Sequence, residues 1–263
     1  MKKLLITFGC SWTFGVGLNY SKGMTKDVYF DNHQNIQIIE SLSFRSLIST
    51  NLGFTNLNFS SGGSSNQRQF RLAKQFFFSK EFETLYNEFD VIVVLWGITS
   101  TARNELYSIE RKDYRNFFLN PNGIKLDNWP FHVDFLKFCY DHDVSVKELT
   151  YEMNMFNVLF DKYNIKNLWF DTFNHHDYNI EIEHLLNNDY THRDLLSTML
   201  LNYNIKVNDN RYHLSNWTID NSKISAGIEH ELLNPYSFHP TVQGHQEICN
   251  IIQPEIIKLL NGF

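Results

Sequence analysis

Short apolar runs alternate with segments of helical periodicity along this chain. The apolar runs cover residues 4–8, 54–60, 90–97 and 165–173. Runs of this length are typical of strands that are buried on both faces of a parallel sheet. Apolar residues at helical spacing predict helices at 41–51, after Ser64 or Ser65, and at 147–162, 192–202 and 241–260. Strands that alternate with helices predict an α/β sandwich with a mostly parallel sheet.

Residues 101–146 interrupt this alternation. They are polar and aromatic with little period, and they contain the turn signal NPNG at 120–123. We interpret them as an insertion, built from a hairpin and a short helix, within a single domain that spans residues 1–263. Farther along the chain, Pro254 predicts that the last helix bends or that a second helix starts there.

The N-terminal stretch KKLLITFGCSWTFGVG has two interpretations. Two lysines before an apolar run are typical of a secretion signal. However, the run is shorter than the roughly 7–15 residues that such a signal needs, and Trp12 and Phe14 stand where small residues are required. We therefore interpret the stretch as a buried strand and a Gly-Cys-Ser turn. No other window approaches the ~20 apolar residues of a membrane span. A soluble protein of the cytoplasm, or of a host-cell cytoplasm, is expected.

Composition narrows the function classes. A net charge of −6 argues against nucleic-acid binding, which favours a basic surface. Three distant cysteines predict neither a disulfide framework nor a zinc site. The stretches NHHD at 174–177 and DHD at 141–143 lack the paired spacing of metal ligands, so no metal is expected. The 23 Phe and 13 Tyr residues predict either a large aromatic core or aromatic surfaces for flat ligands such as sugars.

Residues suited to chemistry stand where the predicted strands end. Ser11 follows the first strand, Gly63 lies in the loop after the second, Thr99 follows the third and Asp171 lies at the end of the fourth. Ligands of such sheets bind at the carboxyl ends of the strands. A serine there becomes a nucleophile when a histidine takes its proton and donors hold the oxyanion. His239, before the last helix, is the candidate histidine.

In their order, these blocks resemble the SGNH (GDSL-type) hydrolase family over nearly the full length. Gly9-Cys10-Ser11 is similar to the Gly-Asp-Ser of the family's first block. Residues 58–63 are similar to the second block, and residues 97–100 to the third. The last block is similar to residues 236–240 and to Gly244-His245, which follow them. The resemblance implies a three-layer α/β/α sandwich with a flavodoxin-like sheet and hydrolysis of esters, including O-acyl groups on carbohydrates, without a cofactor. It implies Ser11 as nucleophile, His239 as base, and an oxyanion hole of Ser11, Gly63 and Thr99. The first block is also similar to those of bacteriophage proteins.

Three residues depart from the family pattern. Cys10 replaces the acid beside the serine, Thr99 replaces an oxyanion-hole Asn, and Tyr236 replaces the acid that orients the histidine. Losing one oxyanion donor costs on the order of 10²–10³ in rate, and losing the orienting acid about 10⁴. Asp171, Glu229 or Glu231 is a candidate replacement for the acid. A backbone carbonyl or a water molecule is the alternative, which leaves a Ser-His dyad. A second Asp-X-X-His at 189–192 lacks the following Pro and Gly-His.

Other residues near the blocks are candidates for substrate binding. Arg103 could supply a charge, paired or not with Glu105, and Trp12 and Trp96 could stack on a sugar ring or simply pack the core. The expected partner is a small-molecule or carbohydrate ester, with no nucleic acid and no membrane. Two alternatives share these residues: a catalytically degenerate module that binds glycans or serves a structural role, and an acyltransferase.

Overall fold

The central sheet of the computed structural model has four parallel strands. The structure describes residues 1–118, 135, 138–172, 176, 178, 182–186, 194–205 and 221–262. Within them, β1 (Lys3–Phe8), β2 (Thr55–Asn58), β3 (Val91–Ile98) and β6 (Lys166–Asp171) are hydrogen-bonded in the order β2-β1-β3-β6. The first strand thus lies between the second and third, as in flavodoxin-like folds. The predicted mostly parallel sheet is confirmed.

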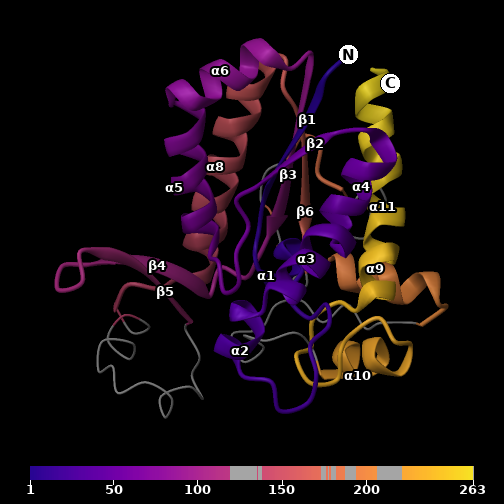
Figure 1. Ribbon diagram of the computed structural model, residues 1–263. Coiled ribbons are helices and arrows are strands. Elements are labelled where there is room, and N and C mark those ends of the chain that lie inside the picture. Colours follow the sequence, from indigo (N-terminus) through magenta and orange to yellow (C-terminus); the bar gives the residue numbers. More distant parts are fainter. Residues whose placement is uncertain are drawn as a thin grey trace.

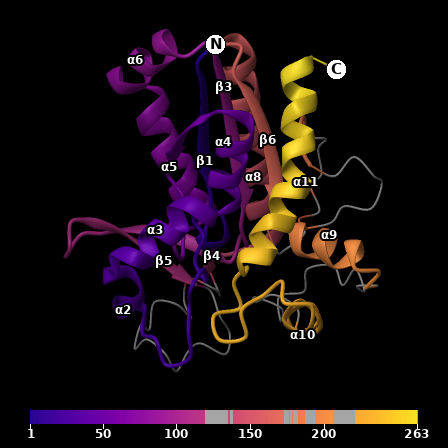
Figure 2. The same ribbon diagram turned by 45° about the vertical axis from the view of Figure 1, so that its right-hand side comes forward.

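Helices cover both faces of this sheet (Figure 1). One layer contains α5 (Asn66–Phe77), α6 (Lys80–Glu88) and α8 (His142–Lys162), and the other contains α4 (Phe44–Leu52), α9 (Leu195–Asn202) and α11 (Val242–Asn261). Successive strand residues point to opposite faces, so the sheet has two apolar cores. On β1, Leu4 and Ile6 pack with α5 and α8, whereas Leu5 packs with α4 and α11. Figure 2 shows the same three layers from a second direction.

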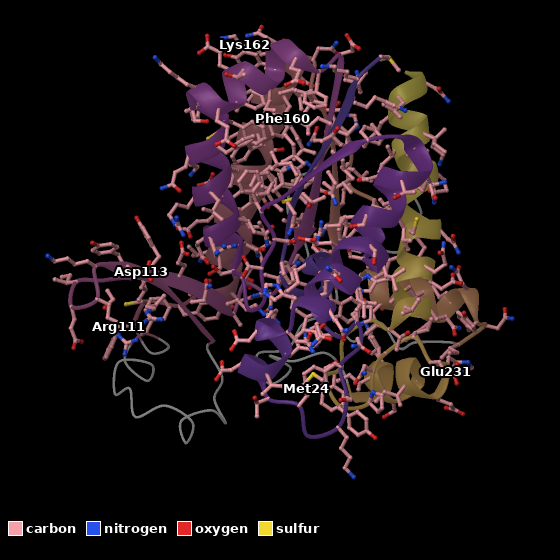
Figure 3. All side chains as sticks on the ribbon, in the orientation of Figure 1. Met24, Arg111, Asp113, Phe160, Lys162 and Glu231 are labelled. Carbon is pink, nitrogen blue, oxygen red and sulfur yellow. The ribbon has the colours of Figure 1, made fainter. Side chains whose placement is uncertain are left out.

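Shorter elements gather near the carboxyl ends of the strands. They are α1 (Ser11–Phe14), α2 (Lys26–Asp31), α3 (His33–Leu42) and α10 (Asn221–Glu229), seen in the lower part of Figure 1. The sequence pattern did not predict α2, α3, α6 or α10. The predicted hairpin is present as β4 (Arg103–Ser108) and β5 (Asp113–Phe118), which pair antiparallel. It extends away from the central sheet, with Arg111 and Asp113 near its turn (Figure 3).

Helix boundaries differ from the prediction at two places. α11 is continuous through Pro254, so no second helix starts there. Buried Ile252 and Ile256 pack on either side of this proline, and that packing holds the helix together. α8 begins at His142 rather than at residue 147, because the side chain of Asp141 accepts a hydrogen bond from the Val144 amide (2.9 Å) and caps the helix. The predicted turn at 120–123 and the stretch 189–192 lie outside the described residues.

None of the helices in the described part of the chain is both long and apolar enough to cross a bilayer.

Candidate active site

Ser11 is the first residue of α1, directly after β1 ends. The chain turns sharply from strand to helix here, and Gly9 allows it. A Cβ at position 9 would lie 2.1 Å from the Thr13 Oγ1 atom. This turn directs the Ser11 hydroxyl toward His239, to whose Nε2 atom it donates a hydrogen bond of 2.8 Å. The structure therefore brings together two predicted residues that are 228 positions apart in the sequence.

The loop that carries His239 is organised by Asn234. The Asn234 side-chain oxygen accepts hydrogen bonds from the Tyr236 and Ser237 amides (2.9 and 3.1 Å), which forms a tight turn. Its Nδ2 donates to the Tyr20 carbonyl (2.9 Å), which ties the loop to the segment after α1. The main-chain N–H of Asn234 also donates to the His239 carbonyl (2.8 Å). The Asn-Pro dipeptide at 234–235 is a turn signal that sequence analysis did not use.

The ring of His239 is held in one tautomer by the main chain. Its Nδ1 atom lies 2.5 Å from the Ser237 carbonyl oxygen. A carbonyl only accepts, so Nδ1 carries the proton and donates it, which leaves the Nε2 lone pair facing Ser11. Burial lowers the pKa of His239 to about 4, a lowering that the Ser237 hydrogen bond opposes and the charge of Arg103 reinforces. The imidazole is therefore neutral at pH 7 and able to accept a proton.

Asp171 does not occupy the position of the orienting acid. Its buried carboxylate accepts hydrogen bonds from the His176 amide (3.1 Å) and the Tyr178 hydroxyl (2.8 Å), and it lies 2.9 Å from the His176 Nδ1 atom. Burial beside this carboxylate raises the pKa of Tyr178 well above its usual value. Glu229 and Glu231 have exposed side chains. The interpretation of Asp171 as the acid is thus corrected, and the Ser237 carbonyl stands in its place.

The Ser11–His239 pair opens into a small cavity of about 310 Å³. Its polar wall contains Ser11, Gly62, Gly63, Arg103, Ser237 and His239, and its apolar wall contains Val16, Tyr20, Tyr29 and Phe30. Tyr29 is fixed because its hydroxyl accepts from the Gly17 amide (3.2 Å) and donates to the Leu18 carbonyl (2.7 Å). The predicted Gly63 therefore lies at the site, next to a wall of aromatic side chains.

Three other predicted site residues lie elsewhere. Thr99 is fully buried and does not line the cavity, and its backbone pairs with the side chain of Asn66 (3.0 and 2.7 Å). Trp12 and Trp96 are core residues, 1% and 0% exposed. The Trp96 ring stacks between Phe8 and Trp169, with ring centroids 4.6 and 4.5 Å away. The assignment of Thr99 to the oxyanion hole and of both tryptophans to substrate binding is wrong in this structure.

Arg103 lines the cavity, and its role as a substrate-binding charge stays a prediction. Glu105 is not its partner there, because its carboxylate forms a two-pronged ion pair with Arg71 of α5 (2.7 and 2.8 Å). This pair fixes β4 against α5 and so holds Arg103 in place at the start of the hairpin. Among the described residues, His, Cys, Asp and Glu side chains form no group of three suited to a metal ion.

Gly17 is a site residue that sequence analysis missed. A Cβ at this position would lie 2.6 Å from the His239 Cβ atom, and the residue has a φ of +105°. Only glycine adopts such a backbone readily while allowing so close an approach. The position of His239 thus requires a residue without a side chain at position 17. The Gly-Val-Gly spacing after the serine block was the available signal.

No family model and no curated protein matches the sequence. Similar solved structures include a candidate SGNH hydrolase from Slackia heliotrinireducens (8% identity, 97% of this chain and 100% of that chain, TM-score 0.36). Another is a lipase/acylhydrolase from Enterococcus faecalis (14% identity, 97% and 95%, TM-score 0.32). The description of the first protein names the SGNH hydrolase family, whose motifs the sequence resembles.

Proposed function

We propose that this protein is a serine hydrolase that cleaves an ester through an acyl-enzyme on Ser11. The observation that carries the proposal is the hydrogen bond from the Ser11 hydroxyl to His239 Nε2 (2.8 Å), with His239 Nδ1 donating to the Ser237 carbonyl. Two successive hydrogen bonds thus join the nucleophile, the base and the acceptor that orients the base, as covalent acyl transfer requires.

The reaction proceeds in two halves. His239 Nε2 takes the hydroxyl proton as Ser11 Oγ bonds to the acyl carbon, and the carbonyl oxygen becomes an oxyanion. We assign the binding of that charge to the backbone N–H groups of Ser11 and Gly63. Two facts support the assignment: Ser11 begins a helix, and Gly63 lines the same cavity. When the ester bond breaks, Nε2 returns the proton to the departing alkoxide. Water then repeats these steps and releases the acid and free Ser11.

The Ser237 carbonyl performs part of the role that the acid has in a Ser-His-Asp triad. It holds the imidazole in the productive tautomer, whose loss is what makes removal of the acid cost about 10⁴ in rate. It lacks the negative charge that stabilises the imidazolium formed during reaction. We therefore expect a Ser-His dyad that reacts more slowly than a full triad, yet well above the uncatalysed rate.

The cavity supports a short acyl substrate. Its volume of about 310 Å³ and its aromatic wall of Tyr20, Tyr29 and Phe30 suit a small acyl group on a flat or cyclic alcohol such as a sugar. An O-acetyl or short acyl ester of a carbohydrate is therefore the proposed substrate class. The contact between Ser11 and His239 weighs against the degenerate binding module, in which the pair need not meet.

Labelling with a fluorophosphonate probe, followed by peptide mass spectrometry, tests the proposal. We expect an adduct on Ser11 of the wild-type protein, and none on Ser11→Ala or His239→Ala. Ser61→Ala, in the neighbouring loop, is the matched control and should label as the wild type does. Absence of an adduct on folded wild-type protein, checked by thermal unfolding, contradicts the proposal. Hydrolysis of 4-nitrophenyl acetate against 4-nitrophenyl octanoate then tests the preference for a short acyl group.

A further inference from the structure

Arg103 lies where two cavities meet. It lines the small cavity together with Ser11 and His239, and it also lines a larger cavity of about 720 Å³ between α5 and α8. Its charge acts on the reaction centre, because it contributes to the lowered pKa of His239. The ion pair of Glu105 with Arg71 anchors the strand that begins at Arg103. The main chain that carries Arg103 is therefore anchored beside the site.

The small cavity has a positive character. Its described lining residues include no carboxylate, and Arg103 is their one permanently charged side chain. His239, with a pKa lowered to about 4, is neutral at pH 7, and burial raises the pKa of Tyr29 to about 12. Electrostatic attraction is strong in such a protected place, because little water screens it.

The chemistry of guanidinium indicates what it recognises. It presents five N–H donors in a planar fork, so that it can bond to a neighbour within the protein and still donate to a ligand. The fork matches the two oxygens of a carboxylate. The cavity is also lined by apolar and aromatic residues, namely Val16, Tyr20, Tyr29 and Phe30. A ligand of this cavity therefore meets one anion-binding group and one apolar surface.

We propose that Arg103 binds a carboxylate of the substrate, so that the protein prefers esters of anionic compounds over neutral esters of the same shape. This inference rests on the proposed ester hydrolysis at Ser11. The carboxylate belongs either to the acyl group, as in a dicarboxylic half-ester, or to the alcohol, as in an acylated acidic sugar. Both sources present the same planar anion to Arg103, and they are separable by experiment.

Two pairs of esters test the proposal. 4-Nitrophenyl hemisuccinate against 4-nitrophenyl butyrate places the charge on the acyl side, and 4-carboxyphenyl acetate against phenyl acetate places it on the alcohol side. The ratio of kcat/KM for the anionic over the neutral ester is measured for the wild type, Arg103→Gln and Arg103→Lys. Arg111→Gln is the matched control, because it removes the same charge from the exposed end of the hairpin (Figure 3).

We expect Arg103→Gln to lower this ratio by about 10- to 100-fold in one pair, as for loss of hydrogen bonds to a charged group. Arg103→Lys should fall in between, and Arg111→Gln should match the wild type. An equal loss for anionic and neutral esters overturns the proposal, because Arg103 then acts on the reacting carbonyl. Unchanged ratios in both pairs also overturn it.

Calorimetric binding of succinate and of 4-hydroxybenzoate separates this inference from the proposed function. If Ser11 forms no adduct and no ester is cleaved, the proposed hydrolysis fails. Binding of either anion to the wild type, lost in Arg103→Gln and kept in Arg111→Gln, then still supports the carboxylate site. If Ser11 does form the adduct but neither anion binds and no ratio changes, the carboxylate site alone is overturned.

Discussion

Replacing Gly17 by alanine should disable the site while leaving the fold intact. The added Cβ would lie 2.6 Å from the Cβ of His239, whereas ordinary contacts begin at 3.4 Å. The two atoms must therefore separate by about 0.8 Å, which is the difference between these distances. Residue 17 cannot easily move away, because its amide donates to the fixed Tyr29 hydroxyl.

The displacement lengthens the Ser11–His239 contact. If the histidine takes up the whole shift along the line of this hydrogen bond, the present 2.8 Å becomes about 3.6 Å, which is beyond hydrogen-bond range. A misplacement of about 1 Å in a reacting group can cost on the order of 10²-fold in rate. We therefore expect the rate of fluorophosphonate labelling and of ester cleavage to fall about 100-fold in Gly17→Ala.

Gly23→Ala is the control for backbone strain. Gly23 also has a positive φ, +81°, yet a Cβ there would meet nothing within 4 Å. Both variants should lose roughly 1–2 kcal/mol of unfolding free energy from the strained backbone, measured by urea unfolding. Only Gly17→Ala should lose reactivity. Wild-type labelling rates in folded Gly17→Ala would refute the reasoning, since the close approach to His239 would then be unimportant.

Three further predictions concern the histidines and their partners. Asp171→Asn and Ser237→Ala should each react with the fluorophosphonate probe at a rate within about 10-fold of the wild type per folded molecule, because the partner of His239 Nδ1 is a main-chain carbonyl. A 10⁴-fold loss of that rate in Asp171→Asn would show instead that Asp171 acts as the acid of a triad. The acid limb of kcat/KM should lie near pH 4 rather than 6.5, because burial keeps His239 neutral, and a stopped assay from pH 3.5 to 8 measures it. Burial lowers the pKa of His239 to about 4 and of His245 to about 3. As the pH falls, these two imidazoles therefore become protonated in the unfolded chain before they do so in the folded protein. Stability from each is complete above about pH 6.5 and is lost as pH falls toward the folded pKa, at up to about 1.4 kcal/mol per pH unit. Urea unfolding should show a shallower pH dependence in His245→Gln, and an identical slope would contradict this.

Local pattern was sufficient to predict three of the central strands, and the order of the motifs along the chain predicted the Ser11–His239 pair. The apolar runs that became β1, β3 and β6 need no partner to be recognised, because burial on both faces leaves a continuous run of large apolar side chains. Ser11 and His239 were predicted because the order of the blocks that contain them resembles the SGNH (GDSL-type) family, with the serine after the first strand and the histidine before the last helix.

Aromatic residues were assigned to the site incorrectly for a physical reason. Trp12 and Trp96 stand next to the site in sequence, but alternate residues of a strand point to opposite faces, and turns redirect those that follow. Trp96 consequently stacks in the core. The cavity wall is instead supplied by Tyr20, Tyr29 and Phe30, from a segment without a clear periodic pattern.

The sequence alone determined the α/β class and the parallel strands, since these depend on local periodicity. The order of its motifs, through their resemblance to the SGNH (GDSL-type) family, predicted that Ser11 and His239 form a pair. Tertiary structure decided what holds the histidine: the Ser237 carbonyl rather than Asp171, with Gly17 making room. Every residue has a backbone carbonyl, so composition and spacing carry no sign of which one will face an imidazole. Only the folded path of residues 234–240, fixed by Asn234, brings that oxygen into position.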